Sequence, residues 1–253
     1  MHIAARVIAG LAWAVAASCA ASAAEIKVLT AGAMKAVVVE LAPAFEASTG
    51  HKLVIDNDTA GGLARRIGGG ETVDVAIITP AAIDALIKEA RIAAGSRVDL
   101  AKVGMGVAVR AGAAKPDITT VEAFKATLLA AKSVAYIDPK AGGSSGIYFD
   151  KLIERLGIAD AVRGKAKLMS GGYVAELVAK GEADLAVHQI SEIVPVEGVV
   201  LVGPLPADVQ NTTVYAGGIG AAARDPAAAK ALLAFLAGAA AKPVLAKKGM
   251  EGM

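Results

Sequence analysis

Four short clusters of small residues are the part of this sequence best suited to hold a ligand. They cover residues 30–33, 59–62, 142–146 and 170–172, and each lies between an apolar run and a helix-like segment. The start of a helix offers unpaired backbone N–H groups and the positive end of the helix dipole. Small residues let a ligand approach these groups closely. Taken singly, each cluster is explained as well by helix capping. Together they predict a cleft that holds a small anion without a neighbouring cation.

Polar residues beside the last two clusters extend the candidate site. Tyr173 follows the cluster at 170–172, and His188 and Gln189 come at the end of an apolar segment that begins at Leu185. Either His188 or Gln189 can donate a hydrogen bond to ligand oxygens, whereas the alternative is a polar strand end in contact with solvent. The candidate ligand-binding residues are Gly32, Ala33, Met34, Ala60, Gly61, Gly62, Ser144, Ser145, Gly172, Tyr173, His188 and Gln189.

The sequence predicts no metal and no cofactor. The glycine-rich stretch at 142–146 lacks the lysine that follows in a phosphate-binding P-loop. The stretch at 218–223 is interrupted too soon by Asp225-Pro226 to begin a dinucleotide-binding helix. The histidines lie far apart, and the only cysteine, Cys19, is near the N-terminus, so no set of metal ligands has a useful spacing.

The first 24 residues have the pattern of a secretory signal peptide. A short basic start is followed by an apolar stretch at 7–17 and by Ala-Ser-Ala at 21–23. The apolar stretch is too short to cross a bilayer. We expect export to the periplasm with cleavage near Ala23/Ala24. The alternative is a lipoprotein whose mature chain begins at a lipid-modified Cys19.

The composition argues against a nucleic-acid-binding protein. The chain of 253 residues carries 26 Lys and Arg against 24 Asp and Glu, without a basic stripe. The mean hydropathy of +0.56 comes from Ala, Gly and Val, and no later apolar stretch is long enough to span a bilayer. We therefore expect a soluble exported monomer whose apolar core, built from about 230 residues, needs no disulfide.

Alternating strand-like and helix-like segments predict an α/β fold in two lobes. Each lobe is expected to be a mostly parallel sheet flanked by helices. Long strands at 103–110 and 213–220 are read as crossovers, which places residues 25–107 and 212–253 in lobe I and residues 108–211 in lobe II. Ligands bind between such lobes, at the carboxyl ends of strands. Residues 249–253 are expected to fray.

Four stretches resemble the periplasmic molybdate-binding protein family. They are residues 28–34, 62–67, 146–148 and 173–192, spread over nearly the whole exported chain. The resemblance implies a class II periplasmic binding protein fold and delivery of an oxyanion to the membrane subunits of an ABC importer. The two serines of the family's site fall on Ala33 and Gly61 here, and its late-strand tyrosine falls on Gln189. Ser145 and Tyr173 match positions that supply backbone N–H groups.

Other stretches are more similar to aconitate isomerase, an exported enzyme with the same fold. They are residues 96–100, 115–118, 133–136 and 189–192. This resemblance implies a small polycarboxylate in the cleft and proton transfer between its carbons, with His188 or Glu192 as the candidate catalytic base. The sequence therefore predicts a periplasmic solute-binding protein for a small oxyanion or a di- or tricarboxylate. The alternative is an isomerase of a small unsaturated tricarboxylate. Because Ala33 and Gly61 lack hydroxyls and leave space, we expect an organic carboxylate to bind more tightly than molybdate.

Overall fold

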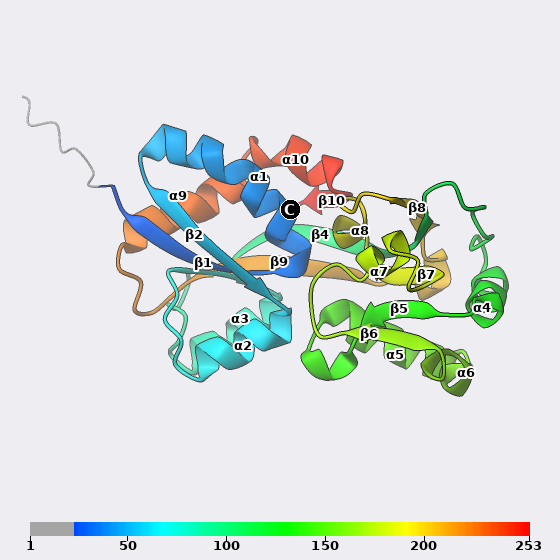
Figure 1. The fold of residues 1–253 in the computed structure, drawn as a ribbon. Helices are drawn as coiled ribbons and strands as arrows, with labels where there is room; N and C mark the ends of the chain where they lie inside the picture. The colour runs from blue at the N-terminus through cyan, green and yellow to red at the C-terminus, as the bar shows by residue number, and fades with distance from the viewer. Residues whose placement is uncertain (1–22) are drawn as a thin grey trace, which may run out of the picture.

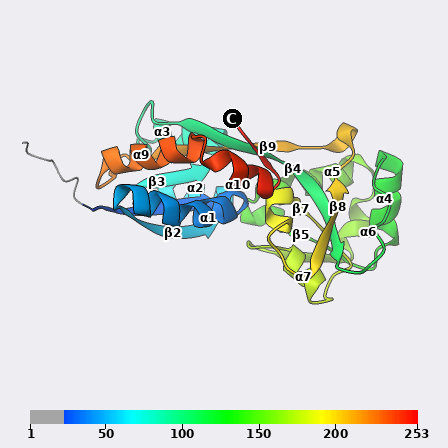
Figure 2. The same ribbon diagram turned by 90° about the horizontal axis from the view of Figure 1, so that it is seen from above.

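The computed structural model describes residues 23–253, and the predicted signal peptide at 1–24 lies almost wholly outside them, as does Cys19. Figures 1 and 2 show two lobes side by side, joined by long strands. The elements in chain order are β1 (Glu25–Ala31), α1 (Gly32–Thr49), β2 (Lys52–Asp58), α2 (Ala60–Gly68), β3 (Val75–Ile78), α3 (Pro80–Lys88), β4 (Val98–Arg110), α4 (Val121–Ala130), β5 (Val134–Ile137), η1 (Pro139–Ala141), α5 (Ser144–Arg155), α6 (Ala159–Arg163), β6 (Ala166–Met169), α7 (Ala175–Ala179), β7 (Leu185–Gln189), α8 (Ile190–Ile193), β8 (Val199–Pro204), η2 (Ala207–Val209), β9 (Thr212–Ile219), α9 (Pro226–Ala237), α10 (Ala241–Lys247) and β10 (Met250–Gly252).

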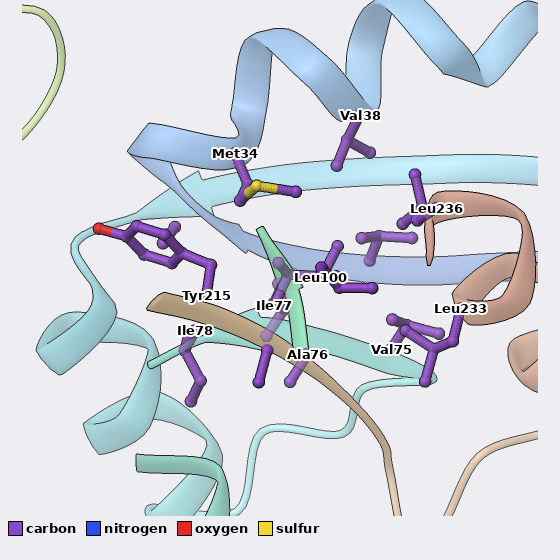
Figure 3. Close-up of a cluster of buried hydrophobic side chains, with 14 of the residues drawn as sticks. Met34, Val38, Val75, Ala76, Ile77, Ile78, Leu100, Tyr215, Leu233 and Leu236 are labelled. Atoms are coloured by element: carbon purple, nitrogen blue, oxygen red, sulfur yellow. The ribbon is translucent and has the colours of Figure 1, made fainter. Parts of the chain in front are cut away.

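The first lobe is built on the strand order β2-β1-β3-β9-β4. β1 is parallel to β2 and β3, whereas β9 is antiparallel to both β3 and β4. Helices α1, α9 and α10 cover one face of this sheet, and α2 and α3 cover the other (Figure 1). β3 is buried on both faces, as its unbroken apolar sequence predicts. The core of the lobe packs β3 against Met34 and Val38 of α1 and Leu233 and Leu236 of α9 (Figure 3).

The second lobe continues the same sheet in the order β4-β7-β5-β6, and β8 also pairs with β4. β5 is parallel to β6 and β7, and β4 is antiparallel to β7 and β8. One buried cluster packs Phe124 of α4 and Phe149 of α5 against the sheet. A second cluster packs Val178 of α7 and Ile193 of α8 against the other face. Each lobe therefore buries apolar side chains on both faces of its part of the sheet.

β4 links the two lobes. Its first half pairs with β9 up to Gly104, and its second half pairs with β7 and β8 from Met105 to Arg110. The core contacts change lobe between Val103 and Met105. The fold is the two-lobed α/β arrangement that the sequence predicts, with parallel strands inside each lobe and antiparallel pairing at the crossing strands. The lobe boundaries at 107/108 and 211/212 stay a prediction.

The C-terminal residues do not fray. β10 pairs antiparallel with β4, and Met250 lies opposite Val103 with 3% of its surface exposed. The prediction of a loose tail at 249–253 was wrong because the buried Met250 and the free edge of β4 stabilise a strand in this short segment.

Among residues 23–253, no single helix is long and apolar enough to cross a membrane, although α9 and α10 reach that length and hydropathy as a pair bent by 57°. Leu232, Leu233 and Leu245 of this pair are buried in the core of the first lobe.

Candidate functional site

A small cleft lies between the lobes, and all four small-residue clusters reach it. Its lining contains no Lys or Arg. The residues that form its wall are Ala31, Gly32, Ala33, Asn57, Asp58, Thr59, Ala60, Ile137, Gly143, Ser144, Ser145, Gly171, Gly172, His188, Glu192 and Tyr215. The cleft is polar, and most of its polar groups are hydroxyls, backbone groups and carboxyls.

Helices α1 and α5 both begin at this cleft, one from each lobe. The residues before them are Ala31 and Gly143, and no side chain caps either helix. Their first turns carry Gly32 and Ala33 on one side and Ser144 and Ser145 on the other, all in the cleft wall. The first N–H groups of a helix have no partner inside the helix. Two positive helix ends therefore open on the same small volume, which favours an anion there.

Helix α2 contributes less to the cleft than its sequence predicts. Thr59 caps it, because its Oγ1 accepts a 2.9 Å hydrogen bond from the Gly62 N–H. The Gly61 N–H donates to the Gly142 carbonyl across the cleft at 3.0 Å. Asp58 places its carboxylate beside Gly62 and accepts a 2.6 Å hydrogen bond from the Thr59 N–H. The N–H groups of Gly61 and Gly62 are thus already used within the protein.

The space expected at Gly61 and Gly62 is filled. A Cβ on Gly61 would lie 2.8 Å from the Gly142 carbonyl oxygen, and one on Gly62 would lie 2.7 Å from the Asp58 carboxylate. The expectation that small residues here enlarge the cleft was wrong, because backbone from the opposite lobe and a neighbouring side chain occupy that room. The glycine at 61 instead allows the two lobes to approach each other.

Three hydrogen bonds hold the lobes together at the cleft rim. The Thr59 hydroxyl donates to the Ala141 carbonyl at 2.6 Å, and the Arg65 guanidinium donates to the same oxygen at 3.0 Å. The Gly61–Gly142 backbone bond is the third. The structure is therefore in a closed arrangement. Arg65 serves this contact, while Arg66 binds Asp56 and Glu71 instead.

Three side chains, Tyr215, Gln189 and Ser144, are hydrogen-bonded to one another at the N-terminal end of α5. The Tyr215 hydroxyl donates to Gln189 Oε1 at 2.8 Å and lies 3.0 Å from Ser144 Oγ, while the Gln189 amide donates to Ser144 Oγ at 3.0 Å. Figure 3 shows Tyr215 at the edge of the first-lobe core with its hydroxyl pointing away from the other labelled side chains. Residues 142–146 read Gly-x-Ser-x-Gly, but Ser144 bonds Tyr215 and Gln189 rather than a histidine, so this serine has no base of the kind a nucleophile needs.

His188 and Glu192 form a buried pair in the cleft wall. His188 Nδ1 accepts a 2.9 Å hydrogen bond from the Gln189 N–H, and its Nε2 lies 3.3 Å from the Gly172 carbonyl. This assigns the neutral ring with its proton on Nε2. Glu192 Oε2 lies 3.4 Å from His188 Nδ1. Burial lowers the pKa of His188 to about 4 and raises the pKa of Glu192 to about 8. Both side chains are therefore uncharged at neutral pH.

The remaining candidates lie away from the cleft wall. The Met34 side chain is buried in the first-lobe core, so only its backbone N–H, in the first turn of α1, remains available to a ligand. Gln189 lies behind Ser144 and holds it in place. Tyr173 has Lys35 Nζ 5.7 Å from its ring centre, and burial raises its pKa to about 12.

Sequence reasoning missed Tyr215 and Asp58 as cleft residues. Tyr215 comes from β9, more than twenty residues after Gln189 in the chain, and only the crossing of β9 between the lobes brings it to Ser144. Asp58 accepts a hydrogen bond from the Thr59 N–H at the start of α2. Its side chain also borders the cleft because β2 ends there.

Known proteins share both the sequence pattern and the fold of this chain. Residues 26–251 match the family of bacterial extracellular solute-binding proteins. Aconitate isomerase from a Pseudomonas species is 36% identical over 232 residues, which cover 89% of this chain and 87% of that protein. The molybdate-binding protein ModA of Azotobacter vinelandii is 29% identical over 244 residues, covering 92% of each.

A solved structure, the periplasmic molybdate-binding protein of Azotobacter vinelandii, has the same two-lobed fold. It superposes with a TM-score of 0.76 at 21% identity, over 89% of this chain and 98% of that one. Sequence, fold and an interlobe cleft with two uncapped helix starts agree. The chain belongs to the family of bacterial extracellular solute-binding proteins.

Proposed function

We propose that this protein captures a small anion, an oxyanion or an organic di- or tricarboxylate, in the cleft between its lobes and delivers it to the membrane subunits of an ABC importer. The observation that carries the proposal is the pair of uncapped helices, α1 and α5, whose first residues face one cleft from opposite lobes. Membership of the solute-binding family supports the transport role.

An organic carboxylate suits the donors of this cleft better than molybdate does. The chain resembles the molybdate-binding family but lacks the two serines of that family's site, because Ala33 and Gly61 occupy those positions here. The hydroxyls that reach the cleft wall come from Thr59, Ser144, Ser145 and Tyr215, and Thr59 already donates to Ala141. Each hydroxyl donor lost to a charged acceptor weakens binding by about 1.5–3 kcal/mol. Two such losses weaken molybdate binding about a hundredfold or more.

Calorimetry on the exported chain, residues 25–253, tests this proposal. The probes are tricarballylate, citrate, molybdate and sulfate at neutral pH. We expect a tricarboxylate to bind more tightly than molybdate. Ser145→Ala removes a hydroxyl from the cleft wall and should weaken binding, whereas Ser48→Ala, on the far end of α1, should not. Submicromolar molybdate binding without carboxylate binding would refute the carboxylate preference, and no binding by any probe would refute the function.

Isomerisation of an unsaturated tricarboxylate is the second candidate function, and the Glu192–His188 pair favours it. A carboxyl whose pKa lies near 8 at the wall of a closed cleft can both give and take a proton at physiological pH. The named activity of the aconitate isomerase relative requires such proton movement between carbons of one ligand. NMR of the vinyl protons of aconitate separates the two functions. Unchanged aconitate indicates a carrier, while interconversion that Glu192→Gln abolishes indicates an enzyme.

Export and assembly state are part of the same proposal. We propose cleavage near Ala23/Ala24 and a monomeric protein in the periplasm. Mass spectrometry of the protein from periplasmic extracts should show a chain without Trp13, and a lipid adduct on Cys19 would refute this processing. Light scattering should give the mass of one chain.

A further inference from the structure

The carboxyl group of Glu192 lines the cleft, and its Oε2 lies 3.4 Å from His188 Nδ1. No shorter hydrogen bond reaches the carboxyl within residues 23–253, and the residue is 6% exposed. Its Oε1 lies against Gly32, so close that a Cβ on that residue would overlap it. The glycine at the start of α1 therefore makes room for this carboxyl. A buried carboxyl that faces a cleft and keeps one oxygen free of hydrogen bonds is in position to bind a ligand.

Among residues 23–253, no Lys or Arg lines the cleft to compensate a negative charge on Glu192. Helix α8 packs against α1, β4, β7 and β8, and the ionisable group that these elements bring to the cleft is His188, which is neutral. Tyr173 and Tyr215 also lie near the carboxyl and are neutral, and Asp58 is a further carboxyl of the cleft wall. The other charged side chains on these elements do not line the cleft: Lys35, Glu40, Glu46, Asp99, Lys102 and Arg110.

We propose that Glu192 is a ligand-binding residue that acts in its protonated form and donates a hydrogen bond to one oxygen of the bound anion. The inference rests on the proposed anion-binding function. A protonated carboxyl supplies an O–H donor, whereas an ionised one would repel an anion in a cleft that holds no Lys or Arg. Burial raises the pKa of Glu192 to about 8, so the donor form predominates at neutral pH.

This assignment makes ligand binding depend on a proton. At pH values below the pKa of Glu192 the cleft is ready to bind, and affinity is independent of pH. Above it, each binding event must also protonate Glu192, so affinity falls about tenfold for each further pH unit. Binding in that range takes up about one proton from the solvent. His188 does not supply this effect, because its pKa is lowered and both its ring nitrogens face backbone groups.

Calorimetry with tricarballylate tests the inference between about pH 7 and 9.5, where the carboxyls of this probe are all ionised. Tricarballylate has no double bond, so isomerisation does not interfere. We expect the affinity to fall about fifteenfold between pH 8 and 9.5, and titrations in buffers of different ionisation enthalpy to show uptake of about one proton at pH 9. In Glu192→Gln the amide keeps a donor at every pH, so the affinity should lose its pH dependence.

Glu176→Gln is the matched control, because Glu176 lies on α7 outside the cleft wall. It should keep the full pH dependence. Binding by the unmodified protein without a fall above pH 8, or a fall that persists in Glu192→Gln, overturns the inference and leaves the proposed function standing. Failure of tricarballylate, citrate, molybdate and sulfate to bind at any pH overturns both.

A second measurement covers the case in which Glu192→Gln does not fold. A ¹³C NMR titration of the carboxyl groups in the unmodified, ligand-free protein should show one glutamate that titrates near pH 8. If every glutamate titrates near or below its ordinary value of 4.5, Glu192 is ionised at neutral pH and the assignment is wrong.

Discussion

The buried Glu192–His188 pair should make the free energy of unfolding fall between about pH 6.5 and 8, and Glu192→Gln should remove that fall. Burial raises the pKa of Glu192 from 4.5 to about 8, so its stabilising contribution is complete below pH 4.5 and is lost as the pH rises to about 8. Burial lowers the pKa of His188 from 6.5 to about 4, so its contribution is present above pH 6.5 and is lost as the pH falls towards 4.

The two contributions have opposite slopes of about 1.4 kcal/mol per pH unit. Between pH 4.5 and 6.5 they cancel, and the free energy of unfolding should be nearly constant with respect to this pair. Between pH 6.5 and 8 only Glu192 still changes, so the protein should lose about 2 kcal/mol. In Glu192→Gln that loss disappears, and His188 alone makes stability rise by about 3 kcal/mol between pH 4.5 and 6.5.

Urea unfolding of the ligand-free protein, followed by far-UV circular dichroism at about pH 4.5, 6.5 and 8, measures these differences. Glu176→Gln serves as a control that removes an exposed carboxyl on α7 and should follow the unmodified protein. Comparison of the variants cancels the titration of other groups. The reasoning is refuted if the unmodified protein keeps its stability between pH 6.5 and 8, or if Glu192→Gln loses it to the same extent.

Two further substitutions and one truncation test other parts of the structure. Gly61→Ala places a Cβ 2.8 Å from the Gly142 carbonyl oxygen, so the lobes should close less well and tricarballylate affinity should fall about tenfold; unchanged affinity by calorimetry would show that the rim contact is dispensable. Tyr215→Phe removes the donor to buried Gln189 and should cost about 1–3 kcal/mol in urea unfolding; an undiminished midpoint would contradict the hydrogen-bonded group. Truncation after Gly249 removes β10 and the buried Met250 and should cost about 2–4 kcal/mol; a tail that contributes nothing to unfolding would restore the prediction that it frays.

The position of the cleft was predictable from sequence because it depends on local signals. Small-residue clusters after apolar runs mark the starts of helices that follow strands, and such starts meet at one edge of an α/β sheet. This reasoning placed residues 30–33 and 142–146 at the same cleft, where Gly32 and Ser144 now lie. Alternation of strands and helices likewise predicted two lobes, since both β4 and β9 are long enough to pass from one to the other.

The chemistry inside the cleft was less predictable because it depends on contacts between distant parts of the chain. The Gly61 N–H donates a hydrogen bond to the Gly142 carbonyl of the opposite lobe, and no local sequence pattern predicts this pairing. Glu192 was considered only as a base implied by resemblance. Its position in the cleft follows from the way α8 packs against α1, where Gly32 leaves room for the carboxyl. Burial and position in the cleft are properties of the fold, so sequence types alone do not reveal them.

A crystal structure of the exported chain with tricarballylate tests the central claim most directly. The account predicts the ligand between the lobes, with one carboxylate within hydrogen-bond distance of the first-turn N–H groups of α1 and another at the first turn of α5 beside Ser144 and Ser145. A Glu192 oxygen should lie within about 2.7 Å of a ligand oxygen, as a protonated carboxyl that donates to a carboxylate does. A ligand bound elsewhere, or a cleft that stays empty while tricarballylate binds in solution, would contradict the account.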